Sequence, residues 1–435
     1  MSMDALVPQV IASIAVIIGI SYLAGAAMRR LGQPAVIGQI LAGILLGPSL
    51  LGQLPGNVEA VLIPPPVVPY LTVVAQIALV LFLLAVGYEL DLGVLRRQRR
   101  AVPIVSSAAL VLPMLLGAGS VFAFGSWYLP GHDGPAPAGF MLYIAIAMSI
   151  TAVPVLASII AERGMTRSRP GVVAMTSAGM IDVVGWLALL VVLLLIGGAS
   201  PVESHSLPVA VALFAGYLLI MIFGVRPMLR RWLQRSGSSP GRNIPVIVTV
   251  GMASAWVTSA LGLHVIFGAF LAGLIMPRTA HGTPDDRLYR PLQETGNLLL
   301  PVFFVVAGLP VDIGGLTGSD FGLLGIVCAV AIVGKVGGGF VGARLGGLRR
   351  REAAIVGVLL NTRGLTELIV LTVGLQAGII DRRLYTILVI MALITTVLTG
   401  PLLGLLRFRR RAGFPAPTRK ASTVSGQPIV VPDPT

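Results

Sequence analysis

The sequence predicts an all-helical integral membrane protein with about 13 transmembrane helices. Hydrophobic residues make up 56% of the 435 residues and charged residues only 11%, whereas soluble domains carry about 25% charged residues. Apolar stretches recur along the chain, as at 68–86, 101–124 and 384–406. Each is about as long as the 20 residues that a helix needs to cross a bilayer core. A soluble fold has no interior large enough to bury so many of them.

The expected spans follow one another with short connections and no soluble domain between them. They lie near 8–27, 35–51, 68–90, 101–128, 138–161, 171–197, 207–225, 243–261, 263–277, 293–309, 320–343, 353–377 and 384–406. The tail 407–435 is polar and rich in proline, which predicts a short disordered segment.

The basic residues predict the orientation in the membrane. Clusters at 29–30, 96–100, 163–169, 226–242, 278–290, 344–351 and in the tail fall in every second connection, and the alternate connections hold only Arg382 and Arg383. Basic residues accumulate on the cytoplasmic side of membrane proteins. We therefore expect an odd number of spans in the cell membrane, with the N-terminus outside and the C-terminus in the cytoplasm.

Composition also excludes several function classes. The formal charge of +14 sits in these short clusters beside anionic lipid, so we expect a lipid bilayer and no nucleic acid as the partner. Cys328 is the only cysteine, which rules out an intrachain disulfide and a cysteine-based metal site. The absence of a dinucleotide-binding, Walker or kinase motif predicts a protein that is not an enzyme and needs no cofactor.

Two charges at membrane depth are the first candidate functional residues, because a charge there is costly and marks function by default. Asp182 lies near the middle of the sixth span, and no neighbour in sequence can neutralise it. Lys335 lies near the middle of the eleventh span of a chain that otherwise uses arginine, and lysine releases its proton more readily than arginine. The structural alternatives are a helix-capping Asp and a Lys bound to helix carbonyls.

Two interrupted spans hold the remaining candidates. In the fifth span, Ser149 and Thr151 precede Pro154, and such a break frees oxygens that can coordinate a cation; an ordinary proline kink is the alternative. In the twelfth span, Arg363 and Glu367 are four residues apart and can pair on one helix face. This pair fits a direct role in transport and a purely structural role equally well.

The positions of the two breaks predict an inverted repeat. The interrupted spans are seven apart, and an odd shift reverses the direction of the chain. Broken helices at matching places in opposed halves indicate a transporter with its site at the midplane. All the unusual charges then fall in one set of six helices, the fourth to sixth and the eleventh to thirteenth.

Several motifs resemble the monovalent cation:proton antiporter-2 family of sodium/hydrogen exchanger-like proteins. The similarity covers residues 8–406, and the stretch from Asn361 to Leu371 is especially close to the plant exchangers. The other matching stretches are 38–43 with 47–48, 82–87, 268–273 and 303–309.

The resemblance implies a homodimer with a moving core, near 101–197 and 320–406, and dimerisation helices near 8–90 and 207–309. It implies that the two discontinuous helices cross beside an essential Asp, which corresponds to Asp182, and that the charged lysine of the core corresponds to Lys335, whose usual acidic partner is missing here. The second acid that some relatives carry would fall at Ile181. With one titrating carboxylate, one proton exchanges for one cation and transport is expected to be electroneutral; if Lys335 also releases a proton, two protons move per cation.

The expected function is therefore a secondary antiporter that exchanges Na⁺ or K⁺ for protons at Asp182, with help from oxygens of Thr151 and Ser149. Two alternatives stay open at this point. One is a channel-like potassium efflux protein, and the other is a proton-coupled exporter of an organic solute or ionophore.

Overall fold

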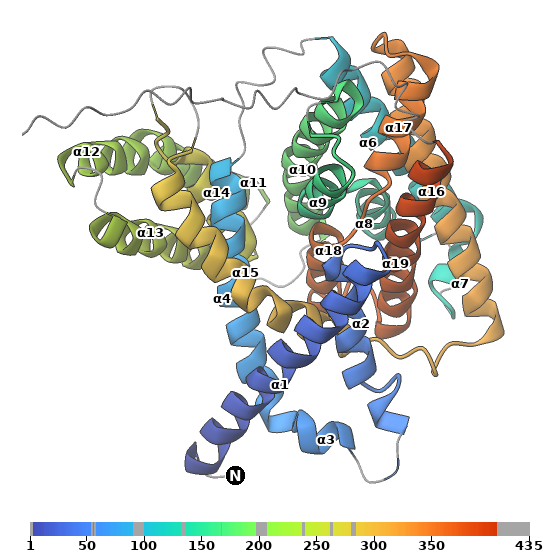
Figure 1. Ribbon diagram of the computed structural model, residues 1–435, viewed down its shortest axis with the longest axis horizontal. Coiled ribbons are helices and arrows are strands. Elements are labelled where there is room, and N and C mark those ends of the chain that lie inside the picture. The colour runs from blue at the N-terminus through green and yellow to red at the C-terminus, as the bar shows by residue number, and fades with distance from the viewer. Residues whose placement is uncertain are drawn as a thin grey trace, which may run out of the picture.

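The computed structural model describes residues 3–53, 55, 58–89, 100–131, 136–166, 168–196, 207–236, 240–261, 264–279 and 284–406. Every regular element in these ranges is helical (Figure 1). The expected tail 407–435 and most of the basic cluster 96–100 lie outside them.

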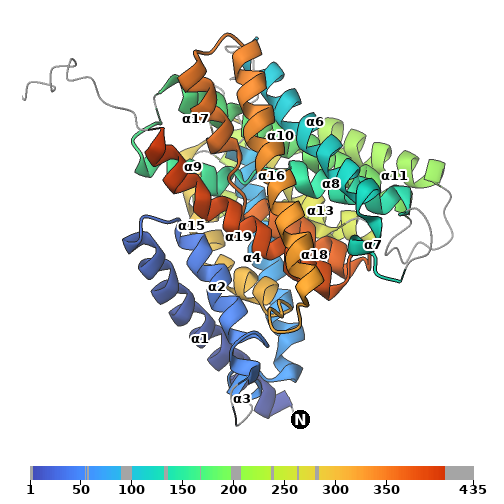
Figure 2. The same cartoon turned by 90° about the vertical axis from the view of Figure 1, so that its right-hand side faces the viewer.

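The helices form two groups by their packing (Figures 1 and 2). We call the first the flanking bundle. Its elements are α1 (Met3–Arg30), α2 (Ala35–Leu46), η1 (Leu51–Gln53), α3 (Val58–Leu62), η2 (Pro65–Val67), α4 (Val68–Glu89), α11 (Leu207–Leu219), the π-helical turn η3 (Ile220–Val225), α12 (Arg226–Ser236), α13 (Pro240–Ala260), α14 (Val265–Ile275) and α15 (Asp286–Gly308).

We call the second group the crossing bundle. It contains α6 (Ala101–Ala123), α7 (Gly125–Tyr128), α8 (Ala138–Ser149), α9 (Val153–Glu162), α10 (Arg169–Ile196), α16 (Gly318–Leu345), α17 (Arg350–Leu360), α18 (Leu365–Gln376) and α19 (Arg382–Leu405). Figure 2 shows α16 in front of this bundle, where it packs along α6 and also contacts α8 and α17.

The number of spans is lower than about 13 when length and apolarity are required together. In the described part of the chain ten helices meet that requirement, or eleven if the bent pair α17–α18 is one span. The expected spans near 263–277 and 293–309 are helical as α14 and α15, but α14 has only 11 residues. The first half of α15 is charged, which lowers its apolarity.

The two expected interruptions are present, so the predicted class with two discontinuous helices is confirmed. Between α8 and α9, residue Ile150 is extended, and a proline stands in the first turn of α9. Between α17 and α18 the chain bends by 41°. Gly364 there has φ 151°, a conformation that only glycine adopts without strain.

The two breaks contact each other, which makes the helices cross. The backbone N–H of Ala152 in the first break donates to the carbonyl of Thr362 in the second, at 3.1 Å. This bond satisfies backbone groups that lipid would leave unpaired. The crossing places four half-helix ends in one buried region of the crossing bundle.

Candidate functional site

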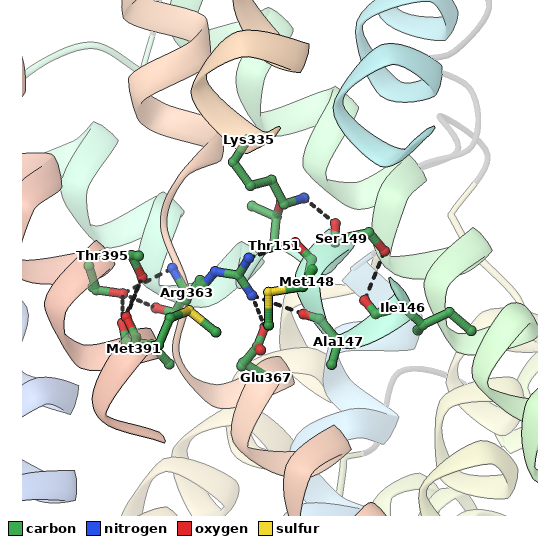
Figure 3. A network of polar contacts seen from close by, with 12 residues as sticks. Ile146, Ala147, Met148, Ser149, Thr151, Lys335, Arg363, Glu367, Met391 and Thr395 are labelled. Carbon is green, nitrogen blue, oxygen red and sulfur yellow. Dashed lines mark hydrogen bonds and ion pairs between the residues drawn. The ribbon is translucent and has the colours of Figure 1, made fainter. Parts of the chain in front are cut away.

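The crossing gathers Ser149, Thr151, Lys335, Arg363 and Glu367 into one region of buried polar contacts (Figure 3), and Asp182 is buried in the same bundle. Asp182 is 4% exposed, and Lys335, Arg363, Thr151 and Glu367 are 0% exposed. They come from α10, α16, α18 and the two breaks, so residues far apart in sequence are buried in the same bundle.

Lys335 binds oxygens of the first break. Its ammonium donates to the hydroxyl of Thr151 at 2.8 Å, to the carbonyl of Ala109 on α6 at 3.3 Å, and to the carbonyl of Ser149. An ammonium has three N–H donors, and each of them has an acceptor. The donors of the Lys335 ammonium therefore find acceptors without a carboxylate partner.

Thr151 links Lys335 to the second broken helix. Its hydroxyl accepts from the ammonium and donates to the carbonyl of Leu360, the last residue of α17, at 3.2 Å. Ser149 contributes through its backbone carbonyl only, because its hydroxyl donates back to Ile146 at 2.8 Å. The oxygens assigned to a cation thus hold a protein ammonium instead.

Asp182 stands apart from Lys335. No ion pair within 4.0 Å joins the two side chains, although their charges interact at longer range. The Oδ1 atom of Asp182 is buried and has no hydrogen-bond partner in the structure. A buried carboxylate oxygen without a donor is costly, so this atom is suited to receive a proton or a cation.

The guanidinium of Arg363 joins the two broken helices at the crossing. It donates to Glu367 Oε2 at 2.6 Å, and to the carbonyls of Ala147 at 2.9 Å and Met148 at 2.6 Å (Figure 3). Those carbonyls end the half-helix α8, which carries partial negative charge there. Glu367 lies in the first turn of α18, where a negative charge is favourable.

Several partners in this network carry no charge and were not expected from the sequence. Thr396 on α19 accepts from the backbone N–H of Arg363 at 3.0 Å and donates to its carbonyl at 2.8 Å. Asn361 donates to the carbonyl of Thr395 at 3.1 Å. The signal in the sequence was the threonine run on α19, which is weak because threonine in a membrane helix usually bonds within its own helix.

The arrangement excludes one kind of site and defines another. Among the described residues no group of three or more His, Cys, Asp or Glu side chains can hold a metal ion. The site combines the carboxylate of Asp182, the basic side chains of Lys335 and Arg363, and the backbone and hydroxyl oxygens of the two helix breaks. Two broken helices that cross beside a buried carboxylate define the class of secondary transporters built on inverted repeats.

The chain belongs to the sodium/hydrogen exchanger family: the family model described as "Sodium/hydrogen exchanger, transmembrane" matches residues 13–408. This is a family of transporters and not of enzymes. The match covers both bundles and all the candidate residues.

Individual relatives agree with this assignment. The chain is 37% identical over 406 residues to Cation/H(+) antiporter 20 of Arabidopsis thaliana, covering 91% of this chain and 48% of the plant protein. It therefore spans about half the length of that relative. Identity to Na(+)/H(+) antiporter NhaS4 of Synechocystis is 35%, covering 90% of this chain and 96% of NhaS4.

A solved structure has the same fold. The sodium proton antiporter MjNhaP1 from Methanocaldococcus jannaschii aligns with a TM-score of 0.69 at 17% identity, over 92% of this chain and 98% of the archaeal chain. At this identity the similarity concerns the fold alone.

Proposed function

We propose that this protein is a monovalent cation/proton antiporter that carries Na⁺ or K⁺ and H⁺ alternately on Asp182. The observation that carries the proposal is the unpartnered, buried Oδ1 of Asp182 beside the crossing. Relatives named as Na(+)/H(+) and K(+)/H(+) antiporters support the two cations. Proton and cation share one carboxylate, so coupling needs no second pathway.

The cation also needs oxygen ligands other than the carboxylate. Thr151 and the carbonyl of Ser149 are the candidates, and at present they bind the ammonium of Lys335. Lys335 therefore acts as a tethered cation that occupies these oxygens while Asp182 is empty. An arriving cation has to displace it from at least one of them.

The charges at the crossing favour electroneutral exchange. Lys335 and Arg363 contribute two positive charges, and Glu367 and ionised Asp182 contribute two negative ones. Binding of one proton to Asp182 and binding of one monovalent cation to Asp182 change the net charge of these four groups by the same amount. In this scheme the ammonium of Lys335 keeps its proton, so that Asp182 is the group that exchanges a proton for the cation.

The remaining parts of the proposal concern orientation and assembly. The N-terminus lies outside and the C-terminus in the cytoplasm, so α10 runs from the inner face to the outer face. The crossing bundle moves as the transport core, and the flanking bundle holds a homodimer together. The positive clusters support the orientation, and the loose contact between the bundles supports the movement.

Antiport in proteoliposomes tests the central assignment. Cation-driven proton movement is measured for the wild type and for Asp182→Asn, which keeps the shape of the side chain and removes its charge. The variant should purify as a folded protein and show no cation-dependent proton flux with Na⁺ or K⁺. Retained flux would overturn the role of Asp182.

Clamping the membrane potential tests the stoichiometry. One net charge per cycle is worth about 2.3 kcal/mol per 100 mV, so an electrogenic cycle would respond strongly to potential. Electroneutral exchange predicts the same rate and endpoint at all potentials. A potential-dependent endpoint contradicts the stoichiometry and leaves the role of Asp182 intact.

A further inference from the structure

The face of α10 that carries Asp182 is buried on both sides of the carboxylate, and only its edge at Met175 and Gly179 is partly exposed. Residues 175, 179, 182, 186, 189 and 193 follow one stripe of α10. Beyond Asp182 toward the end of α10, Trp186 is 4% exposed, Leu189 0% and Leu193 7%. Before it, Met175 and Gly179 are only partly buried.

Gly179 leaves free space next to Asp182. A methyl group built on Gly179 would meet no atom within 4 Å outside its own helix backbone. Glycine is the poorest helix former apart from proline, and its presence one turn before Asp182 leaves room for a side chain at the edge of this face.

Trp186 closes the opposite side by contact with the other bundle. Its ring meets the ring of Phe267 on α14 edge-on, with centroids 5.9 Å apart and planes at 87°. Phe267 is 4% exposed and lies in the first turn of α14. This contact joins the helix that carries Asp182 to the flanking bundle, one turn beyond the carboxylate.

Polar contacts between α19 and the end of α15 also join the two bundles. The hydroxyl of Tyr385 on α19 donates to the carbonyl of Ala307 on α15 at 2.5 Å. The backbone N–H of Asp312 donates to Thr386 at 3.2 Å. These groups lie where α15 ends and α19 begins, which is the outer face in the proposed orientation.

We propose that Trp186 and Phe267 form a gate that closes the path between the outer face and Asp182, while the space beside Gly179 lies on the inner side of the carboxylate. The proposal rests on the proposed orientation and site. To open the gate, α10 must separate from α14, which is the relative movement of the two bundles that transport requires. The gate thus couples outer access to the position of the crossing bundle.

Cysteine accessibility tests the gate without relying on transport. Asp182→Cys is made in a Cys328→Ser background and exposed to a membrane-impermeant, positively charged thiol reagent. Right-side-out cells report access from outside, and inside-out vesicles report access from inside. With Trp186 present, labelling should be fast from inside and slow from outside.

Removing either ring should open the outer path. We expect Trp186→Ala to raise the outside labelling rate about tenfold, which corresponds to about 1.4 kcal/mol between the closed and open conformations. Phe267→Ala should have the same effect, and the double variant should add little. If Trp186→Ala does not fold, Phe267→Ala deletes the same contact from the other bundle.

Two further variants supply the control and the opposite result. Trp256 is 70% exposed on α13, so Trp256→Ala should leave both labelling rates unchanged. Gly179→Leu should slow labelling from inside. The gate is overturned if neither ring deletion changes outside labelling, if Trp256→Ala changes it equally, or if the increase occurs only from inside. Loss of transport in Asp182→Asn has no bearing on these rates.

Discussion

Replacement of Arg363 by methionine should destabilise the protein far more than loss of its carboxylate partner. The guanidinium of Arg363 donates three hydrogen bonds, of which only one goes to Glu367. In Arg363→Met the carboxylate of Glu367 stays buried without its partner, and the carbonyls of Ala147 and Met148 lose their donors. Breaking a buried ion pair from one side costs about 3–5 kcal/mol, and we expect a loss at the upper end of this range.

Glu367→Gln should cost less because the guanidinium keeps both carbonyls. The amide oxygen can still accept one bond, now without the assistance of charge, so we expect a loss of about 1–2 kcal/mol. The double variant with methionine at both positions removes both buried charges. It should therefore be more stable than Arg363→Met alone.

Unfolding of the purified protein in detergent, followed by heat or denaturant, measures these differences. The matched control is the exposed pair of Arg290 and Asp286, also four residues apart at 3.4 Å, with side chains 70% and 72% exposed. An exposed helical pair is worth about 0.3–0.5 kcal/mol, so Arg290→Met should change little. Equal losses of unfolding free energy for Arg363→Met and Glu367→Gln would refute the view that the guanidinium stabilises the crossing through the two carbonyls.

Three further changes have defined outcomes. Gly364→Ala forces a side chain into φ 151° and should lower the free energy of unfolding by about 1–3 kcal/mol in the same assay. The control Gly119→Ala lies on an exposed helical face with no atom within 4 Å and should be neutral. Equal effects of the two variants would contradict the strained break. Thr151→Val removes the hydroxyl that joins the buried ammonium to the second broken helix, so the KM for the cation in proteoliposomes should rise about tenfold or more; an unchanged KM would remove Thr151 from the site. Asp320→Asn weakens the bond to Arg383 and the helix cap and should lower the unfolding free energy by about 1 kcal/mol without changing the KM; a changed KM would place this outer pair in the transport path.

Part of the site was readable from the sequence because charge at membrane depth is rare. Asp182, Lys335, Arg363 and Glu367 stand out from their apolar surroundings without any alignment. The breaks were also readable, since proline and glycine disrupt a helix through local geometry that does not depend on tertiary contacts. The span count was less readable, because the apolar stretch 263–277 was expected to cross the membrane whereas α14 within it has only 11 residues.

The sequence by itself determined the class of the protein, the candidate residues of the site and the two helix breaks, because helix length, burial cost and helix breaking are local properties. Only the tertiary structure decided which groups meet. It placed Lys335 on oxygens of the first break, left one oxygen of Asp182 without a partner, and set Trp186 against Phe267. These pairings join helices that are far apart in the chain, and packing in three dimensions selects them from many apolar faces of similar composition.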